Sequence, residues 1–553
     1  MSVTDIAILS SVSNEETASP LSLEKDKIAW WKGAVIYQIY PRSFKDSNGD
    51  GIGDIPGIIE NLDHVASLGV DGIWLSPFFT SPMADFGYDI ANFCDVDPIF
   101  GTLKDFDALI SKAHSLGLKV IIDQIYSHSS DQHPWFEDSR QSRNNPKSDW
   151  YVWADAKPDG TPPNNWQSVF GMGAWQWDAR RGQYYLHNFL VEQPDLNLHN
   201  TEVQEAILDV TRFWLERGVD GFRLDALNFS MHDPELKDNP VETVFKRPPT
   251  RPFDFQRHVN SMSHPDIPKF LEGIRAVIDE FSDRFTVAEV GGPFPMAEMK
   301  AFTTGDKRLN SAYAFDFLYA PDLSAKRITE TLSEWPGEKG EGWPSWAFSN
   351  HDAPRAVSRW RGSCPEDQYA KLLAAILVSF RGNIFVYQGE ELGLPQAEVA
   401  FEYLQDPEAI TNWPETLGRD GARTPIPWDQ SNRCAGFSTE TPWLPVDETH
   451  LSKTVASQNA DKNSVLNFYR TVLALRKNSE AIRIGDIEFV EKSSETLLIK
   501  RYTQAETRFC AFNLTDTTQS LPHLFRAEPE IIVGSTRENN KLAPYSGFIS
   551  KAL

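Results

Sequence analysis

Cysteine is scarce in this chain of 553 residues: Cys94, Cys364, Cys434 and Cys510 stand far apart, and no two have C-x-x-C spacing. This pattern suggests neither a disulfide framework nor a zinc site, so a reducing compartment is the simpler interpretation. No apolar run reaches the roughly 20 residues that cross a bilayer. Residues 1–26 lack the basic start and apolar stretch of a secretory signal. We therefore expect a cytoplasmic protein with a loose N-terminal tail over 1–26 and no membrane partner.

Positive charge is also in deficit. The chain has 53 Lys and Arg against 78 Asp and Glu, a formal net charge of −25. A field of that sign repels phosphate backbones and anionic lipids, so we do not expect nucleic acid as a partner. A small neutral substrate fits this charge better. Hydrophobic residues at 41% and charged residues at 24% are typical of folded globular proteins, and the length predicts two or three domains.

Short apolar runs alternate with amphipathic stretches from residue 34 onward, as in βαβ units with a parallel sheet. Eight such runs predict an α/β fold, a closed (β/α)8 TIM barrel whose chemistry lies at the C-terminal ends of its strands. The runs cover residues 34–40, 72–77, 119–124, 221–226, 284–290, 312–318, 345–352 and 383–391.

Two parts of the chain depart from the barrel pattern. A stretch rich in Trp, Asn, Pro and Gly at 129–197, after the third run, is too long for one helix and predicts an inserted subdomain over the strand ends. Short alternating runs from 480 to 553 predict a C-terminal antiparallel β-sandwich. The barrel itself is then expected in two parts, 27–128 and 198–479.

Three of the runs end in acids. Alternation places Arg223 and Asp225 on one face of a strand, so we expect the guanidinium to keep the Asp225 carboxylate ionised and to lower its pKa. Glu289 follows an apolar run, where partial desolvation would raise its pKa towards that of a general acid. Asp352 follows His351, which can donate to sugar hydroxyls while the carboxylate balances developing positive charge.

Taken one by one, these acids have ordinary explanations: a structural ion pair, a solvated glutamate and a loop. Three acids on nonadjacent strands of one barrel, all at the catalytic face, instead indicate catalysis. Glycosidic bond cleavage needs such a set, because one carboxylate attacks or shields the anomeric carbon while a carboxylic acid protonates the leaving oxygen.

The segments GFRLDALNF (221–229), TVAEV (286–290) and FSNHD (348–352) resemble ordered motifs of glycoside hydrolase family 13, the α-amylase family. The resemblance runs from about Trp30 to the C-terminus. By this resemblance Asp225 is the nucleophile and Glu289 the general acid/base of a retaining mechanism. Asp352 is the transition-state stabiliser, and neighbouring Arg223 and His351 belong to the substrate site.

Two further motifs resemble the same family. DQIYSHSS (123–130) places His128 at the position of a sugar-binding histidine, although Ser127 replaces the usual asparagine. QPDLN (193–197) resembles the motif that separates the α-glucosidase and oligo-1,6-glucosidase branch from true α-amylases. The resemblance therefore implies an α-glucosidase.

Two loops bear on where such an enzyme cuts. In the members that this chain resembles, Asp85 and Arg419 match an ion pair that grips the terminal glucose, closes one end of the pocket and enforces exo cleavage. Tyr88 would stack beneath that glucose. A surface ion pair with a core tyrosine is the alternative. The resemblance thus implies release of glucose from the non-reducing end of short α-glucosides.

Linkage preference rests on fewer residues. Ala226 follows the nucleophile, and small residues there resemble α-1,4-acting members whereas Val resembles α-1,6-acting ones, so we favour α-1,4 and leave α-1,3 open. Phe170 and Phe189 in the inserted subdomain are candidate walls for the leaving-group sugar, with a core role as the alternative.

The segment DSNGDGIGD (46–54) has the oxygen-ligand spacing of a hard-cation loop, with glycines that permit a tight turn. In the glucosidases that it resembles, this loop holds a structural Ca²⁺ or Mg²⁺, so we expect one divalent ion there and no organic cofactor. A turn held only by its own side chains is the alternative. The expected ligands are Asp46, Asn48, Asp50, the Ile52 carbonyl and Asp54.

Two other functions share parts of this pattern. A catalytically inactive barrel of the transporter heavy-chain type would have a membrane anchor and would lack the acids, and neither condition holds. A glucosyltransferase or sucrose-isomerising enzyme of the same family shares every residue named above, so transglycosylation is expected at least as a side activity. Sequence leaves monomer and homodimer equally open.

Overall fold

The computed structural model describes residues 28–245, 248–335, 337, 340–416, 418–492, 495–522, 525, 527–534 and 541–553. The tail predicted over 1–26 lies outside the described residues. Within this part of the chain, no helix combines the length and apolar character that would carry it across a membrane. All four cysteine thiols are free.

Eight parallel strands close into a barrel in the order β1-β13-β12-β11-β10-β9-β5-β2. The closure is made where β1 pairs in parallel with β13, with Val35 opposite Ile384. Every run predicted from the sequence contributes one strand, so the barrel prediction is confirmed. The strands are β1 (Val35–Ile39), β2 (Gly72–Leu75), β5 (Lys119–Ile125), β9 (Gly221–Asp225), β10 (Phe285–Val290), β11 (Ser311–Ala314), β12 (Trp343–Ala347) and β13 (Asn383–Tyr387).

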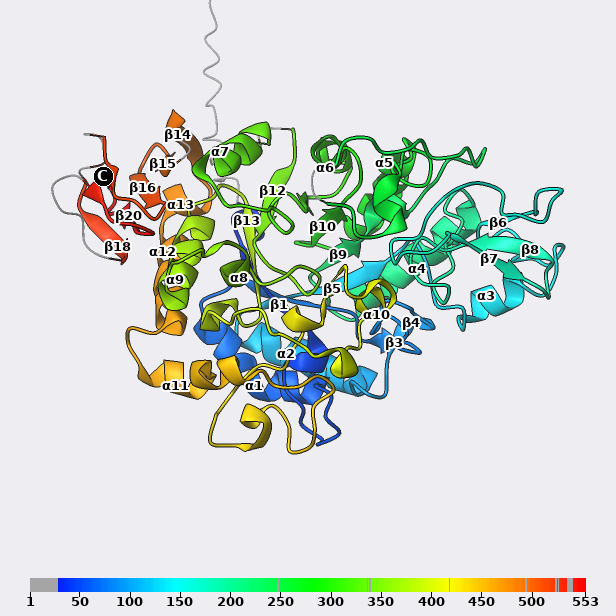
Figure 1. Ribbon diagram of the computed structural model, residues 1–553, viewed down its shortest axis with the longest axis horizontal. Helices are drawn as coiled ribbons and strands as arrows, with labels where there is room; N and C mark the ends of the chain where they lie inside the picture. The colour runs from blue at the N-terminus through cyan, green and yellow to red at the C-terminus, as the bar shows by residue number, and fades with distance from the viewer. Residues whose placement is uncertain are drawn as a thin grey trace, which may run out of the picture.

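Helices follow the strands and cover the outside of the barrel (Figure 1). Their apolar faces join the outward-facing strand residues in one large core. Several begin at a side-chain cap, which satisfies backbone N–H groups that the first turn leaves unpaired: Asp54 caps α1 and Asn200 caps α4. The barrel helices are α1 (Ile55–Ser67), α2 (Leu103–Ser115), α4 (Thr201–Glu216), α5 (Ile267–Ile278), α6 (Pro295–Thr303), α7 (Ala325–Glu334), α8 (Ala356–Trp360), α9 (Glu366–Val378) and α12 (Val465–Asn478).

Inside the barrel the side chains change from apolar to polar along the strands. Ile121 on β5 and Val287 on β10 belong to a separate buried cluster within the barrel. Two residues further along each strand, where alternation returns the side chain to the same face, stand Asp123 and Glu289. The parallel register sets Asp123 beside Arg223. A layer of charged groups therefore lies at the C-terminal end of an apolar barrel core.

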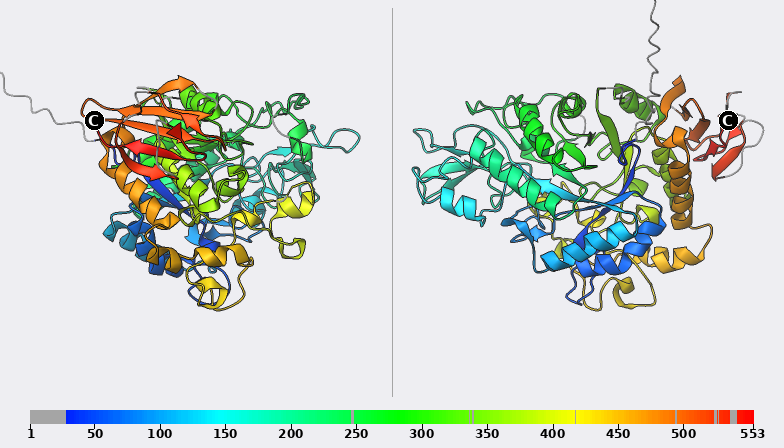
Figure 2. Two further views of the ribbon diagram at one scale, coloured as in Figure 1. Left: turned by 60° about the vertical axis from the view of Figure 1, so that its left-hand side comes forward. Right: turned by 180° about the vertical axis from the view of Figure 1, so that it is seen from behind.

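Two β-structures extend from the barrel at opposite ends of the long axis, as Figures 1 and 2 show. Between β5 and α4, the segment predicted as an insertion forms α3 (Pro134–Ser139) and an antiparallel sheet of β6 (Trp153–Ala154), β8 (Gln183–Leu186) and β7 (Trp175–Asp178).

At the other end, a five-stranded antiparallel sheet packs against a two-stranded ribbon, which confirms the predicted C-terminal β domain. The sheet contains β14 (Asp486–Lys492), β15 (Thr496–Tyr502), β16 (Thr507–Asn513), β20 (Gly547–Ser550) and β18 (Pro529–Val533), and the ribbon pairs β17 (Gln519–Ser520) with β19 (Lys541–Leu542).

Arg476 of α12 lies at the seam between the first and last barrel strands. Its guanidinium is buried and donates to the carbonyl oxygens of Gly33, just before β1, and of Gly382, just before β13. It also donates to the carbonyls of Val378 and Phe380 at 2.7 and 3.0 Å. A single side chain thus satisfies carbonyls on both sides of the closure, where unpaired buried acceptors would be costly.

Candidate active site

One buried guanidinium gathers the acids of three neighbouring strands. Arg223 Nη1 lies 2.6 Å from Asp123 Oδ1 and 2.5 Å from Asp225 Oδ1. Its Nη2 lies 2.5 Å from Glu289 Oε1. The structure therefore brings Asp225 and Glu289 to the two terminal nitrogens of the Arg223 guanidinium. This is expected if both acids serve a single reacting centre. Glu289 also receives the Ala226 N–H at 3.2 Å and faces the Tyr313 hydroxyl at 3.3 Å.

The protonation of these acids differs from the prediction. Burial raises the pKa of Asp225 to about 7, with Asp123 and Asp352 adding to burial and Arg223 opposing it. Arg223 does lower the pKa of Asp225, as predicted, but burial outweighs it and the net pKa is raised. Burial likewise raises the pKa of Glu289 to about 7, as predicted. Because three buried carboxylates share one cation, the group retains a proton near neutral pH.

Asp352 has the opposite environment. Burial alone would raise its pKa, but His351, Arg423 and Arg419 outweigh burial and hold the pKa of Asp352 well below its usual range. Arg423 Nη2 lies 2.8 Å and Arg419 Nη1 3.4 Å from Asp352 Oδ1. Its side chain is 22% exposed, against 10% for Asp225. Of the three predicted catalytic acids, Asp352 is therefore the one that stays ionised, and its side chain is partly exposed.

His351 is held in one tautomer by its neighbours. The Gln38 side-chain amide donates to Nδ1 at 2.8 Å, which leaves the ring proton on Nε2. Nε2 lies 2.5 Å from the Tyr88 hydroxyl, and the two rings are parallel with centroids 5.5 Å apart. Tyr88 also reaches Asp123 Oδ2 at 3.3 Å. Tyr88 and His351 thus form one rigid wall beside the carboxylates.

The loops after β2 and β13 meet at a second buried guanidinium. Arg419 Nη2 lies 2.8 Å from Asp85 Oδ1 and 2.8 Å from Asp406 Oδ1. The Arg419 Cζ atom also lies 5.1 Å from the centroid of the Phe170 ring. Phe170 therefore packs against the ion pair and is not only a core residue. The predicted Asp85–Arg419 pair therefore exists and is buried, which excludes the surface ion pair considered from sequence.

His128 and Phe189 line the side formed by the inserted subdomain. His128 Nε2 lies 3.2 Å from the Tyr88 carbonyl and its ring is 5.0 Å from that of Phe189. Ser127, the departure from the family pattern, contacts His128 Nδ1 at 2.9 Å. Gln193 links His128 at 3.2 Å to Asp85 at 3.3 Å. These contacts place His128 next to the Asp85–Arg419 pair.

The loop of 46–54 is closed by hydrogen bonds among the predicted ligands. Asp46 is buried and accepts the backbone N–H groups of Gly49 and Gly51 at 2.7 and 2.8 Å. Burial opposes ionisation, but the Ser438 hydroxyl and these N–H groups outweigh it and lower the pKa of Asp46. Asp54 caps α1 through Gly57. Three carboxylates, an amide and a carbonyl are oxygen donors suited to a hard cation.

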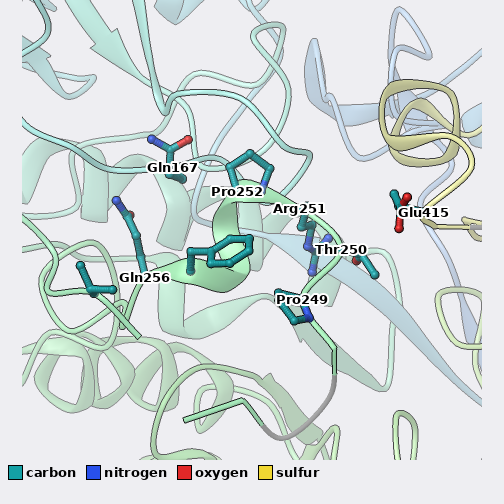
Figure 3. A pocket seen from close by; sticks show the side chains of 9 residues that line it. Gln167, Pro249, Thr250, Arg251, Pro252, Gln256 and Glu415 are labelled. Carbon is teal, nitrogen blue, oxygen red and sulfur yellow. The ribbon is translucent and has the colours of Figure 1, made fainter. Parts of the chain in front are cut away.

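A solvent-open cavity of about 660 Å³ lies at the rim of the barrel (Figure 3). The insertion, the loop after β9 and the loop after β13 all contribute to its walls, through Gln167, Gln256 and Glu415 among others. Arg251 of this wall pairs with Glu408 at 2.6 Å, close to Asp406. The cavity therefore adjoins the Arg419 cluster from outside.

Sequence reasoning missed several members of the site. Asp123 is the penultimate residue of the third predicted run, where the alternation argument used for the other acids could have found it. Arg423 lies four residues after Arg419 in the same loop but was given no role. Asp406 lies in an irregular loop with no pattern to mark it, and only the folded chain shows that it faces Arg419.

Comparison with known proteins follows the same line. The family model of the alpha-amylase catalytic domain matches residues 38–485. A probable alpha-glucosidase of Rhizobium meliloti is 54% identical over 93% of this chain and 94% of its own length. An oligo-1,6-glucosidase of Parageobacillus thermoglucosidasius is 36% identical over 92% and 94%.

Two solved structures resemble the fold closely. The alpha-glucosyl transfer enzyme XgtA superposes with a TM-score of 0.90 at 49% identity, over 95% of this chain and all of that one. The trehalulose synthase MutB of Pseudomonas mesoacidophila MX-45 gives a TM-score of 0.86 at 32% identity, over 95% and 99%. Hydrolysis and transfer therefore both occur among similar proteins.

Proposed function

Because the chain belongs to the alpha-amylase family and is a glycoside hydrolase, we propose that it is an exo-acting, retaining α-glucosidase that releases glucose from the non-reducing end of short α-glucosides. The observation that carries the proposal is the single Arg223 guanidinium that holds Asp225 and Glu289 at 2.5 Å each. Two carboxyl groups fixed side by side are what double displacement needs.

The geometry supports the following steps. Asp225 attacks the anomeric carbon while Glu289 donates its proton to the glycosidic oxygen, so a covalent glucosyl-enzyme forms and the remainder of the substrate leaves. Glu289, now ionised, takes a proton from water as the water attacks the same carbon and frees Asp225. Asp352, which remains an anion, balances the positive charge that develops on the sugar.

Exo specificity rests on the second guanidinium. Arg419 with Asp85 offers a charged donor and acceptor to vicinal hydroxyls, and both are buried between loops. A further sugar at this end would have to displace the ion pair. The substrate therefore ends here, and its remaining part extends towards the rim.

The anomer of the first-formed glucose tests the mechanism. Proton NMR of maltose hydrolysis, recorded before mutarotation, should show α-glucose released from the cleaved non-reducing unit. First-formed β-glucose would contradict the double displacement. Maltotriose labelled at its reducing end tests the exo mode, because the label should appear in maltose and never in free glucose during the first turnover.

Transfer competes with hydrolysis whenever a sugar hydroxyl replaces water in the second step. The similarity to a glucosyl transfer enzyme and a trehalulose synthase favours this second activity. Products from maltose, nigerose, isomaltose and sucrose at rising concentration would measure the partition. If a sucrose isomer or a transfer product dominates even at low substrate concentration, the main activity is that of a sucrose-isomerising enzyme or a glucosyltransferase and not that of an α-glucosidase.

Linkage preference can be tested at Ala226, whose φ of 40° and ψ of 42° are left-handed. A β-branched side chain is strained in this region by about 1–2 kcal/mol. We expect Ala226→Val to lower the unfolding free energy by about that amount and to shift the maltose-to-isomaltose ratio of kcat/KM at least about tenfold towards isomaltose. Ala226→Gly is the control for strain, since glycine accepts this conformation, and an unchanged ratio in the valine variant would contradict the α-1,4 preference.

The loop of 46–54 is proposed to hold one Ca²⁺ or Mg²⁺. We expect EDTA to lower the melting temperature while leaving kcat measured well below that temperature nearly unchanged, because the loop lies outside the carboxylate cluster. Asp50→Asn should reduce the fall in melting temperature that EDTA causes, because it removes one proposed carboxylate ligand. Asp50 suits this test because it is exposed and caps no helix. An equal melting temperature with and without EDTA in the unaltered protein would show that the loop is held only by its own hydrogen bonds.

We also propose that the protein acts in the cytoplasm on neutral sugars, as a monomer or homodimer. The four free thiols and the charge of −25 support this setting. Cell fractionation and light scattering would test the two statements separately.

A further inference from the structure

Two histidines and an aspartate meet at the starts of α4 and α5, outside the Arg223 cluster. His199 directly precedes the cap of α4, and His264 and Asp266 lie just before α5. One ligand atom from each of the three residues lies within 4.8 Å of the other two. Segments far apart in sequence therefore present imidazole nitrogens and a carboxylate oxygen to one point.

The orientation of His199 is fixed by a carbonyl. Its Nε2 lies 2.8 Å from the backbone oxygen of His232. Because a carbonyl only accepts, Nε2 carries the proton and Nδ1 keeps its lone pair. Histidines that bind metals hold their second nitrogen in this way, through a backbone carbonyl or a carboxylate, which orients the ring and selects the tautomer.

His264 and Asp266 complete the group. His264 Nδ1 accepts the Asp266 backbone N–H at 3.3 Å and lies 3.7 Å from Asp266 Oδ2. Asp266 occupies the cap position of α5, yet its carboxylate makes no capping hydrogen bond and is 65% exposed. Its oxygens are therefore available to a ligand.

We propose that His199, His264 and Asp266 bind one late first-row transition metal ion, with Zn²⁺ as the physiological candidate and water at the remaining position. Two nitrogens and one carboxylate oxygen suit Zn²⁺ or Cu²⁺, whereas Ca²⁺ and Mg²⁺ prefer oxygen alone. A tetrahedral ion with ligands at about 2.0–2.1 Å needs ligand atoms about 3.4 Å apart, so the three side chains would have to move closer together than they stand here.

Such an ion would tie the start of α4 to the start of α5. The segment between β9 and α5 includes Ala226, which donates to Glu289, and Asn228, whose carbonyl receives the Ser263 N–H at 2.7 Å. Ser263 is the neighbour of His264. The ion would therefore hold the C-terminal end of the segment between β9 and α5 in place, and stabilise this segment against unfolding.

Zinc binding by the full-length protein, free of any histidine tag and stripped of transition metals, tests the proposal. CaCl2 is kept constant, so that the loop of 46–54 is not in question. Isothermal titration with ZnCl2 should give one site per chain and a zinc-dependent rise in melting temperature, with no competition from Mg²⁺. His264→Ala and Asp266→Asn should each weaken zinc binding about tenfold or more.

His114→Ala is the matched control, because His114 is also half-exposed and pairs with a carboxylate, Asp220, outside this group. It should bind zinc as the unaltered protein does. Co²⁺ gives a second readout, since its tetrahedral visible absorption should appear in the unaltered protein and be absent from the His264→Ala variant with an unchanged circular dichroism spectrum. No saturable zinc binding, or equal binding by the double variant His264→Ala/Asp266→Asn, would overturn the proposal. Neither result bears on glucoside cleavage.

Discussion

Replacement of Asp225 by alanine should lower kcat on maltose by about 10⁴-fold or more, the range found when a covalent catalyst is removed. Glu289→Ala should have a comparable effect on maltose but a smaller one on an aryl α-glucoside, because a good leaving group needs little protonation. The two acids therefore differ in which substrates expose their loss, although burial raises the pKa of both to about 7.

Azide separates the two roles further. In Asp225→Ala, azide can enter the vacated space and displace the leaving group of an aryl α-glucoside directly, which inverts the centre and yields β-glucosyl azide. In Glu289→Ala, Asp225 still forms the covalent intermediate, and azide attacks it to yield α-glucosyl azide. The same anomer from both variants would contradict the assignment.

Glu298→Gln is the matched control for these variants. Burial raises the pKa of Glu298 to about 7 as well, but this residue lies on α6, outside the Arg223 cluster. Its kcat should stay close to that of the unaltered protein. A fall in kcat comparable to that of Asp225→Ala would contradict the assignment, because it would mean that a buried acid with a raised pKa is needed for catalysis even without contact with Arg223.

Arg419→Ala is expected to be costly in two separable ways. It leaves Asp85 and Asp406 buried without their shared cation, and removal of one partner of a buried pair costs about 3–5 kcal/mol of unfolding free energy. It also removes the closed end of the pocket, so kcat/KM on maltose should fall by about 10²-fold or more. Urea unfolding and initial rates measure the two effects.

Arg419→Lys and Arg212→Ala serve as controls for that experiment. Lysine keeps the charge but cannot span two carboxylates, so it should recover stability more than activity. Arg212 forms an exposed pair with Glu280 at 3.0 Å, and its loss should cost less than about 1 kcal/mol and leave maltose turnover unchanged. If Arg419→Ala cleaves maltose at the normal rate, the closed-pocket explanation of exo cleavage fails.

Sequence alone predicted the barrel well, because apolar runs at regular spacing reflect burial on both faces of a parallel sheet. It also predicted that Asp225 and Glu289 meet, since alternation decides which side of a strand faces inward, but it missed Asp123. It did not predict the raised pKa of Asp225. That depends on the register that sets Asp123 beside Arg223, and on one guanidinium serving three carboxylates, which are properties of the assembled strands.

Asp406 marks the limit of such reasoning more sharply. It lies in the connection after β13, where no periodicity predicts which way a side chain faces, and it meets Arg419 through a loop that only tertiary packing fixes. The same applies to the zinc group, whose members come from two helix starts more than 60 residues apart.

The position of Arg476 at the closure of the barrel has a consequence for biosynthesis. The first strand leaves the ribosome more than 400 residues before this side chain, and the last strand nearly 90 residues before it. Until α12 is synthesised, the carbonyls at Gly33 and Gly382 lack the donor that joins them. The hydrogen bonds that join the two sides of the closure therefore form only after the C-terminal part of the chain has been made.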